Sequence, residues 1–187
     1  MSTAPAYLAH WGLAEAPFQL DPDPRFAFER TDHREGLARI LFGITQLGGL
    51  VVITGEIGSG KTLLSQTLRQ TLDGEGFAVA EVANPPRTAA ALLAAALPGV
   101  GAVPAGGSAH RLAGRVRGRL GEVGGEGRRV VLAIDEAQRL DARALDEVRL
   151  LTNRGSDGPG APVVLLGQPE LTARIERQPQ VAQRVVV

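Results

Sequence analysis

One glycine-rich segment of eight residues constrains the fold of this chain more than any other feature of the sequence. It reads Gly55-Glu56-Ile57-Gly58-Ser59-Gly60-Lys61-Thr62 and fits the pattern G-x-x-x-x-G-K-[ST]. The apolar run 50–54 precedes this segment, and an amphipathic run follows it. A strand, a tight turn and a helix in this order form one unit of a parallel sheet covered by helices. The segment therefore predicts an α/β fold in which the turn binds phosphate.

The residue types in this segment suit the chemistry of a bound nucleotide triphosphate. Glycines let the backbone curl so that N–H groups face phosphate oxygens, and the helix N-terminus adds partial positive charge. We expect the Lys61 ammonium, from the only lysine of the chain, to reach the β- and γ-phosphates. The Thr62 hydroxyl is expected to bind Mg²⁺. The predicted nucleotide-binding residues are Gly55, Glu56, Ile57, Gly58, Ser59, Gly60, Lys61, Thr62 and Leu63.

The composition argues against several other classes of protein. The chain has 187 residues with 20 basic and 20 acidic side chains, and this zero net charge does not favour nucleic-acid binding. It has no cysteine, and its three histidines (His10, His33 and His110) are scattered, which argues against a zinc or iron site. Residues 1–20 do not resemble a signal peptide, and no apolar run is as long as the about 20 residues that a membrane span needs. We therefore expect a cytoplasmic location.

The remaining sequence alternates between apolar runs and amphipathic segments. Residues 1–30 carry aromatic rings that we expect to pack on the body of the domain, and the segment 33–46, with Asp32 as its N-cap, predicts an amphipathic helix. Strands are predicted at 49–54, 77–82, 129–134, 163–166 and, as a beginning only, 185–187. We therefore expect an N-terminal extension with a first helix over 1–48 and an ATPase core over 49–187. Arg111, Arg115 and Arg119 predict a basic row on a helix over 109–123, either solvated or facing a partner.

Three polar positions are expected near the phosphate-binding turn because they follow strands. Asp135 and Glu136 end the apolar run 130–134, and a parallel sheet gathers such residues at the carboxyl ends of its strands. Asp135 is predicted to hold Mg²⁺ or its waters, and Glu136 to polarise the attacking water. Gln168, after the fourth strand, is placed to contact the γ-phosphate or that water. Arg184 precedes the last apolar run and could stabilise charge in a neighbouring subunit's site, although a plain surface role is an equal alternative.

Together these motifs resemble the AAA+ ATPases, with the glycine-rich turn as Walker A and the segment 130–136 as Walker B. More narrowly, the chain resembles the ExeA/GspA-like ATPases of general secretion and pilus-type systems. The stretches that carry this resemblance, besides Walker A, are Trp11-Gly12-Leu13, Pro17-Phe18, Pro22-Asp23-Pro24, His33-Arg34-Glu35-Gly36-Leu37, Asp135-Glu136-Ala137-Gln138, Leu150-Leu151-Thr152-Asn153 and Leu166-Gly167-Gln168-Pro169-Glu170-Leu171.

The resemblance implies a three-layer P-loop fold with a five-stranded parallel sheet in the order 5-1-4-3-2. It also implies that Gln168 is the sensor-1 residue, that Arg184 is the arginine finger, and that His33 and Arg34 lie near the adenine. ATP and Mg²⁺ are the implied cofactors. Members of the family continue into a helical lid, whereas this sequence ends at the fifth strand, so we expect a core without the lid domain.

Three functions are compatible with these features. The first is an ATPase whose hydrolysis drives assembly or remodelling of a partner complex, with a homo-oligomer formed through the arginine-finger side and a secretion or pilus system as partner. The second is a nucleotide-gated binding switch with little turnover. The third is a transposition ATPase of the MuB/TnsC type that acts on DNA, for which the basic row over 109–123 is the only support.

Overall fold

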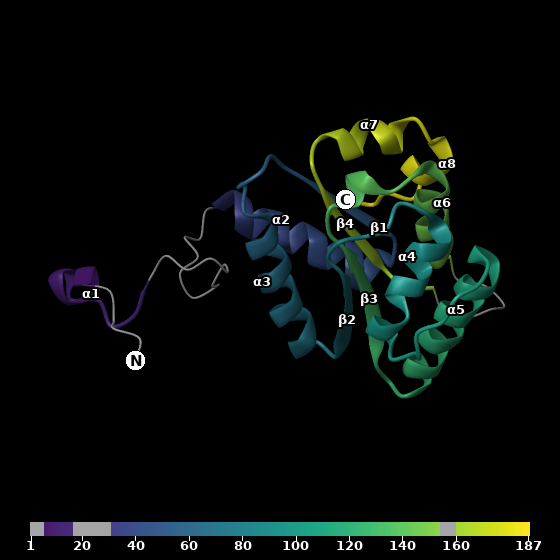
Figure 1. The fold of residues 1–187 in the computed structure, drawn as a ribbon, viewed down its shortest axis with the longest axis horizontal. Coiled ribbons are helices and arrows are strands. Elements are labelled where there is room, and N and C mark those ends of the chain that lie inside the picture. Colours follow the sequence, from purple (N-terminus) through teal and green to yellow (C-terminus); the bar gives the residue numbers. More distant parts are fainter. Residues whose placement is uncertain (1–5, 17–30, 154–159) are drawn as a thin grey trace.

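The computed structural model describes residues 6–16, 31–153 and 160–187 of the chain. Within these ranges a parallel sheet lies at the centre of the main body, with helices on both of its faces (Figure 1). The four strands are β1 (Leu50–Thr54), β2 (Phe77–Val82), β3 (Arg129–Ile134) and β4 (Val163–Gly167). Their order across the sheet is β1-β4-β3-β2, and every pair is parallel. The predicted α/β class and the order 1-4-3-2 are confirmed.

The prediction of five strands is wrong, because the described sheet has four. The segment 184–187 does run beside β1, where the Leu50 N–H donates to the Arg184 carbonyl at 3.1 Å and the Val52 N–H to the Val187 carbonyl at 2.9 Å. However, the pairing of Leu50 with Val185 is a single isolated bridge. A strand requires consecutive pairs, and only two residues follow Val185 in this sequence.

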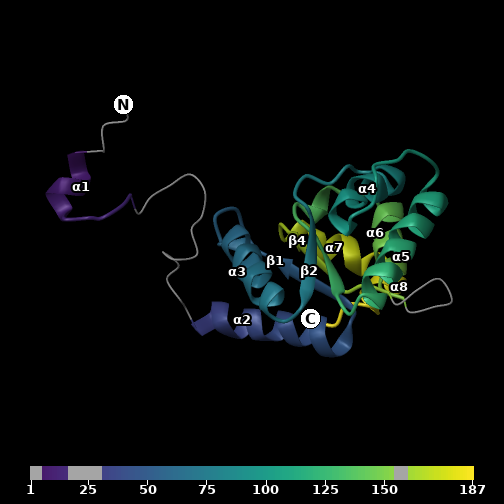
Figure 2. The same ribbon diagram turned by 90° about the horizontal axis from the view of Figure 1, so that it is seen from below.

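Helices cover the sheet unequally on its two faces. Figures 1 and 2 show α2 (Thr31–Phe42) and α3 (Lys61–Gly74) on one face. The other face carries α4 (Ala89–Ala96), α5 (Ala109–Gly125) and α6 (Ala142–Leu151), and the short helices α7 (Glu170–Glu176) and α8 (Pro179–Ala182) follow β4. Each crossover between parallel strands thus contains a helix, as this topology requires.

The central strands are buried on both faces, which explains why their sequences are continuously apolar. In β4, Val163 and Leu165 pack in the core beneath α4, α5 and α6, whereas Val164 packs with the helices of the opposite face. The same alternation separates Val131 from Leu132 in β3. The two hydrophobic cores therefore share one sheet, because successive side chains of a strand point to opposite faces.

Two helices begin at residues whose side chains accept a hydrogen bond from the first turn. The Ala144 N–H donates to Asp141 Oδ1 at 2.8 Å, which caps α6, and the Arg111 N–H donates to Ser108 Oγ at 3.4 Å at the start of α5. The helix predicted over 33–46 begins at Thr31 and closes with a π-helical turn over Gly43–Leu47. Gly48, with φ of 64°, ends this turn in the left-handed conformation that glycine adopts without strain.

The N-terminal aromatic residues do not all behave as predicted. Helix α1 (Ala6–Trp11) carries Tyr7 and Trp11, whose side chains are 39% and 71% exposed, so these rings are not buried against the body. The Trp11 ring instead meets His10 edge-on, with centroids 5.0 Å apart. The other aromatic residues of the segment, Phe18, Phe26 and Phe28, lie outside the described residues.

The arginine row of α5 contacts its own chain. Arg115 donates to the Val103 carbonyl at 3.1 Å, and Arg119 pairs with Glu122 on the next turn. The loop before α5 also approaches this row closely, because a Cβ at Gly107 would lie 2.9 Å from Arg111 Nε. Arg115 therefore fastens the Gly/Pro-rich loop to the helix, whereas Arg119 is paired within the helix. In the described ranges no helix is long and apolar enough to cross a bilayer.

The position of Leu165 predicts a large effect on stability. Leu165 is fully buried in the central strand β4, so Leu165→Ala is expected to lower the free energy of unfolding by about 2–5 kcal/mol. Leu47→Ala is the matched control, because Leu47 is 49% exposed and its truncation is expected to cost less than about 1 kcal/mol. Urea denaturation of both variants measures the difference, and equal losses would contradict this description of the core.

Candidate functional site

The glycine-rich turn between β1 and α3 has the backbone geometry that its sequence predicts. Gly58 and Gly60 have φ of 79° and 90°, a region that residues with a side chain rarely adopt. Gly55 is favoured by space rather than by φ, because a Cβ there would lie 2.5 Å from Ser59 Oγ and that side chain would have to move. The three glycines thus permit one compact loop, and the Ser59 N–H donates across it to the Glu56 carbonyl at 3.1 Å.

The Lys61 side chain folds back over this loop. Its Nζ donates to the Gly55 carbonyl at 2.6 Å and to the Glu56 carbonyl at 2.8 Å. The ammonium therefore lies at the mouth of the loop, held by two neutral acceptors. An ammonium held only by carbonyl groups retains its full positive charge for an anion.

The first turn of α3 presents backbone donors at the same place. The Leu64 N–H is the first of the helix to donate backward, to the Gly60 carbonyl at 2.9 Å. The N–H groups of Lys61, Thr62 and Leu63 precede it and have no acceptor within the helix. Thr62 is exposed, and Ile57, in the loop, is 84% exposed. This geometry suits an anion at the helix N-terminus.

The end of β3 places two carboxylates at the same edge of the sheet as this loop, and β4 lies between β3 and β1. Asp135 continues the strand, with its N–H donating to the Val82 carbonyl at 3.1 Å. Its Oδ1 accepts the N–H of Glu136 at 2.8 Å. Glu136 has φ of 52°, and in the described ranges no other residue except glycine has positive φ. The chain therefore turns sharply at Glu136, and both carboxylates are half-buried.

Gln138 joins this turn to the end of β4, a contact that the sequence analysis did not predict. Its Nε2 donates to Glu136 Oε2 at 2.7 Å, and its Oε1 accepts the N–H of Gln168 at 3.1 Å. Residues two positions apart seldom face one another in regular structure, so spacing gave no signal for this contact. A glycine at position 167, directly before the polar Gln168, is the one sequence feature that could have indicated a close approach.

The register of the sheet brings these groups to one edge. Thr54 pairs with Gly167 and Ile134 with Leu165, so β1, β3 and β4 end side by side. The Gly55 N–H donates directly to the Gly167 carbonyl at 3.2 Å. The structure thus gathers the phosphate-binding turn, the Asp135–Glu136 pair and Gln168 at the carboxyl edge, where ligands bind in open parallel sheets.

Arg184 lies at the opposite edge of the sheet, where the strands begin. Its carbonyl accepts the N–H of Leu50, the first residue of β1, whereas the phosphate-binding turn follows the last residue of that strand. Four residue steps along a strand span about 13 Å, which is beyond the reach of an arginine side chain. Arg184 is exposed and does not belong to the site of its own chain.

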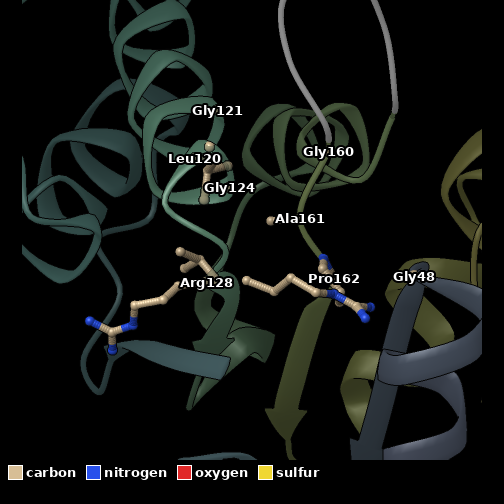
Figure 3. Close-up of a pocket in the computed structure, with 11 residues that line it drawn as sticks. Gly48, Leu120, Gly121, Gly124, Arg128, Gly160, Ala161 and Pro162 are labelled. Carbon is tan, nitrogen blue, oxygen red and sulfur yellow. The ribbon is translucent and has the colours of Figure 1, made fainter. Parts of the chain in front are cut away.

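A pocket of about 450 Å³ also lies at this opposite edge (Figure 3). It is bounded by Gly48, by the start of β3 at Arg128 and Arg129, and by Gly160–Pro162 before β4. Figure 3 shows Leu120, Gly121 and Gly124 of α5 above it. The Arg129 guanidinium stacks over the Phe77 ring at 4.4 Å and donates to the Thr45 carbonyl at 3.2 Å. The pocket is therefore separate from the candidate site.

The donor set at the carboxyl edge fits Mg²⁺. Mg²⁺ prefers oxygen ligands and keeps several waters, so one carboxylate and one hydroxyl suffice beside a bound phosphate. Asp135 Oδ1 already accepts a backbone N–H, which leaves the second carboxylate oxygen for the ion or its waters. Within the described residues no cluster of three histidine, cysteine or acidic side chains could hold a metal by itself.

The residues expected near the adenine are described only in part. The His33 side chain lies outside the described residues, and Arg34 is an exposed residue of α2. Helix α2 packs on the same face of the sheet as α3. Their role in base recognition therefore stays a prediction.

At this edge of the sheet a strand leads into a phosphate-binding turn, and two carboxylates follow a second strand. These features define a nucleotide-binding α/β domain, and comparison with known families identifies the family. The chain belongs to the AAA domain family, whose model matches residues 44–175. It is also 38% identical to General secretion pathway protein A of Aeromonas hydrophila over 96% of its length. The chain spans 33% of that relative.

Solved structures share the fold at low sequence identity. The ORC2 protein of Aeropyrum pernix, in its ADPNP-ADP complexes, matches with a TM-score of 0.68 and 20% identity, over 90% of this chain and 49% of the other. The Cdc6p protein of Pyrobaculum aerophilum matches with a TM-score of 0.65 and 19% identity, over 88% and 46% of the two chains. These matches show the fold alone.

Proposed function

We propose that this chain binds ATP with Mg²⁺ at the carboxyl edge of its sheet and hydrolyses it to ADP and phosphate. The observation that carries this proposal is the convergence of three groups at that edge. They are the Lys61 ammonium, the free amides at the start of α3, and the Asp135–Glu136 pair. The ammonium and the amides suit a polyphosphate, and an acidic pair at the same edge suits a metal ion and a polarised water.

The proposed roles follow from the chemistry of each group. Lys61, the loop amides and Leu63 hold the phosphates, and Thr62 with Asp135 holds Mg²⁺, which neutralises phosphate charge when it is bound. Glu136 accepts hydrogen bonds and can orient the attacking water as a general base. Gln168, at the end of β4, is proposed to contact the γ-phosphate or that water. Membership of the AAA domain family supports this assignment.

A second chain is proposed to complete the site. Arg184 is exposed and too far from its own phosphate-binding turn, so it can act as an arginine finger only on a neighbouring subunit. This placement supports a homo-oligomer in which the edge bearing Arg184 faces the carboxyl edge of the next chain.

The partner complex of this ATPase is proposed from its similarity to the curated relative. The name General secretion pathway protein A and the 38% identity support a role in assembling or remodelling a secretion or pilus-type complex from the cytoplasmic side. DNA is not favoured as a partner, because Arg115 and Arg119 of α5 already contact groups of their own chain and the net charge is zero.

Metal removal tests the proposed function directly. We expect the chain to bind ATP and release phosphate with Mg²⁺ present, and to lose phosphate release in excess EDTA. Thr62→Ala is expected to weaken ATP binding in Mg²⁺ by about tenfold while leaving binding in EDTA nearly unchanged, because one charge-assisted ligand is lost. Calorimetry and a steady-state phosphate assay measure both quantities.

Ser65→Ala is the matched control, since Ser65 lies one turn further along α3 and is not part of the proposed site. Tight binding with phosphate release near background would instead select the nucleotide-gated switch. Absence of ATP binding by the unmodified chain would disprove both functions.

A further inference from the structure

The Gln138 side chain bridges the ends of two strands, and its orientation is determined from both sides. Its Oε1 accepts the backbone N–H of Gln168 at 3.1 Å, and its Nε2 donates to Glu136 Oε2 at 2.7 Å. A backbone N–H can only donate and a carboxylate can only accept. The amide therefore cannot be turned over without losing both hydrogen bonds, so its two ends are assigned by chemistry.

The space for this amide depends on Gly167. A Cβ at position 167 would lie 2.9 Å from Gln138 Oε1 and 2.9 Å from Leu171 Cδ2. No side-chain Cβ fits at these distances without displacement of its neighbours. Because Gly167, the last residue of β4, has no side chain, Gln138 can reach the end of this strand.

The other end of the bridge is a strained residue. Glu136 adopts φ of 52° and ψ of 34°, a left-handed conformation that is strained for a residue with a side chain. Two hydrogen bonds hold it there, from its N–H to Asp135 Oδ1 and from Gln138 Nε2 to its carboxylate. The carboxylate direction is thus set by its neighbours rather than by the backbone alone.

We propose that Gln138 is a positioning residue for hydrolysis, which orients the Glu136 carboxylate and couples it to the end of β4. This inference rests on the proposed function, because it gives Glu136 a water to polarise. One carboxylate oxygen is held by Gln138, and the other stays available for that water. A shift of the Gln168 backbone on phosphate contact would be transmitted through the amide to Glu136.

Gln138→Ala and Gln138→Glu test this role in the full chain. Because a positioned general base contributes about 10²- to 10⁴-fold to a rate, we expect Gln138→Ala to lower kcat by about tenfold or more. ATP affinity is expected to stay within a factor of about three, since Gln138 does not line the phosphate-binding turn.

Gln138→Glu separates positioning from a merely structural role. The introduced carboxylate repels the Glu136 carboxylate and cannot donate to it, whereas its oxygen can still accept the N–H of Gln168. The kcat of Gln138→Glu is therefore expected to fall at least as far as that of Gln138→Ala, while ATP affinity again stays within a factor of about three.

Gln70→Ala and Gln70→Glu, at an exposed position of α3, are the matched controls and are expected to leave kcat unchanged.

Hydrogen exchange of the Gln168 amide supplies a readout that needs no turnover. Its exchange is expected to accelerate in Gln138→Ala and to stay slow in Gln138→Glu, whose carboxyl oxygen can still accept. The inference is overturned if both variants, shown by thermal denaturation to be folded, keep the full kcat, or if their ATP affinity falls as far as their kcat. Failure of the unmodified chain to release phosphate would instead overturn the proposed function, and the positioning role with it.

Discussion

Lys61→Ala is expected to weaken ATP binding by about 10- to 100-fold, the value of one hydrogen-bonded charge contact to phosphate. Its ammonium lies at the mouth of the glycine-rich turn, within 2.6 and 2.8 Å of two loop carbonyls. Removal of the side chain leaves the loop amides in place, so weak binding remains while phosphate release falls to background. Calorimetric titration with ATP and Mg²⁺ measures the loss of affinity.

The composition of the chain offers an independent check on this variant. Lys61 is the only lysine, so an amine-selective reagent can modify only this side chain and the terminal amine. ATP is expected to slow modification of Lys61 and not that of the terminal amine, as mass spectrometry of the labelled peptides would show. Equal labelling with and without ATP, or unaltered affinity in Lys61→Ala, would contradict the assignment of the loop.

Glu136→Gln is expected to lower kcat by about 10²- to 10⁴-fold while ATP affinity changes by less than about threefold. The substitution preserves the shape of the side chain and removes its ability to accept a proton. Because Glu136 follows β3 and is not part of the loop, the loss is expected in turnover and not in binding. Single-turnover phosphate release, combined with the binding assay, separates the two quantities.

Glu126→Gln is the matched control, since Glu126 is exposed at the end of α5, beside the opposite edge of the sheet. It is expected to leave kcat and affinity unchanged. Hydrolysis that persists in both Glu136→Gln and Lys61→Ala would show that the turnover arises elsewhere.

Local sequence patterns were sufficient to predict most of the fold. The runs 77–82 and 129–134 were predicted as strands and are the strands β2 and β3, because residues buried on both faces leave a continuous apolar signal. Asp141, a residue type that favours helix N-caps, accepts the N–H of Ala144, since capping is decided within four residues. Parallel pairing then brings the strand ends together, which explains why Asp135 and Gln168 were predicted at one edge.

Contacts between segments distant in sequence were not predictable in the same way. The bridge from Glu136 through Gln138 to Gln168 depends on the left-handed turn at Glu136, and no residue type there indicates positive φ. The exposure of Trp11 was missed because an aromatic residue is usually buried. The prediction of a fifth strand was wrong because an apolar run such as 185–187 indicates strand propensity but not how many residue pairs it forms with a neighbouring strand.

The folded-back position of Lys61 has a consequence for how tightly the loop can hold any anion. The ammonium already satisfies the carbonyl oxygens of Gly55 and Glu56. Two of its three N–H donors are thus directed at the protein, so a phosphate that needs more than the third donor must displace a carbonyl, and the measured affinity includes the free energy of that exchange. Residues that alter the direction of those carbonyls would tune this exchange without ever touching the nucleotide.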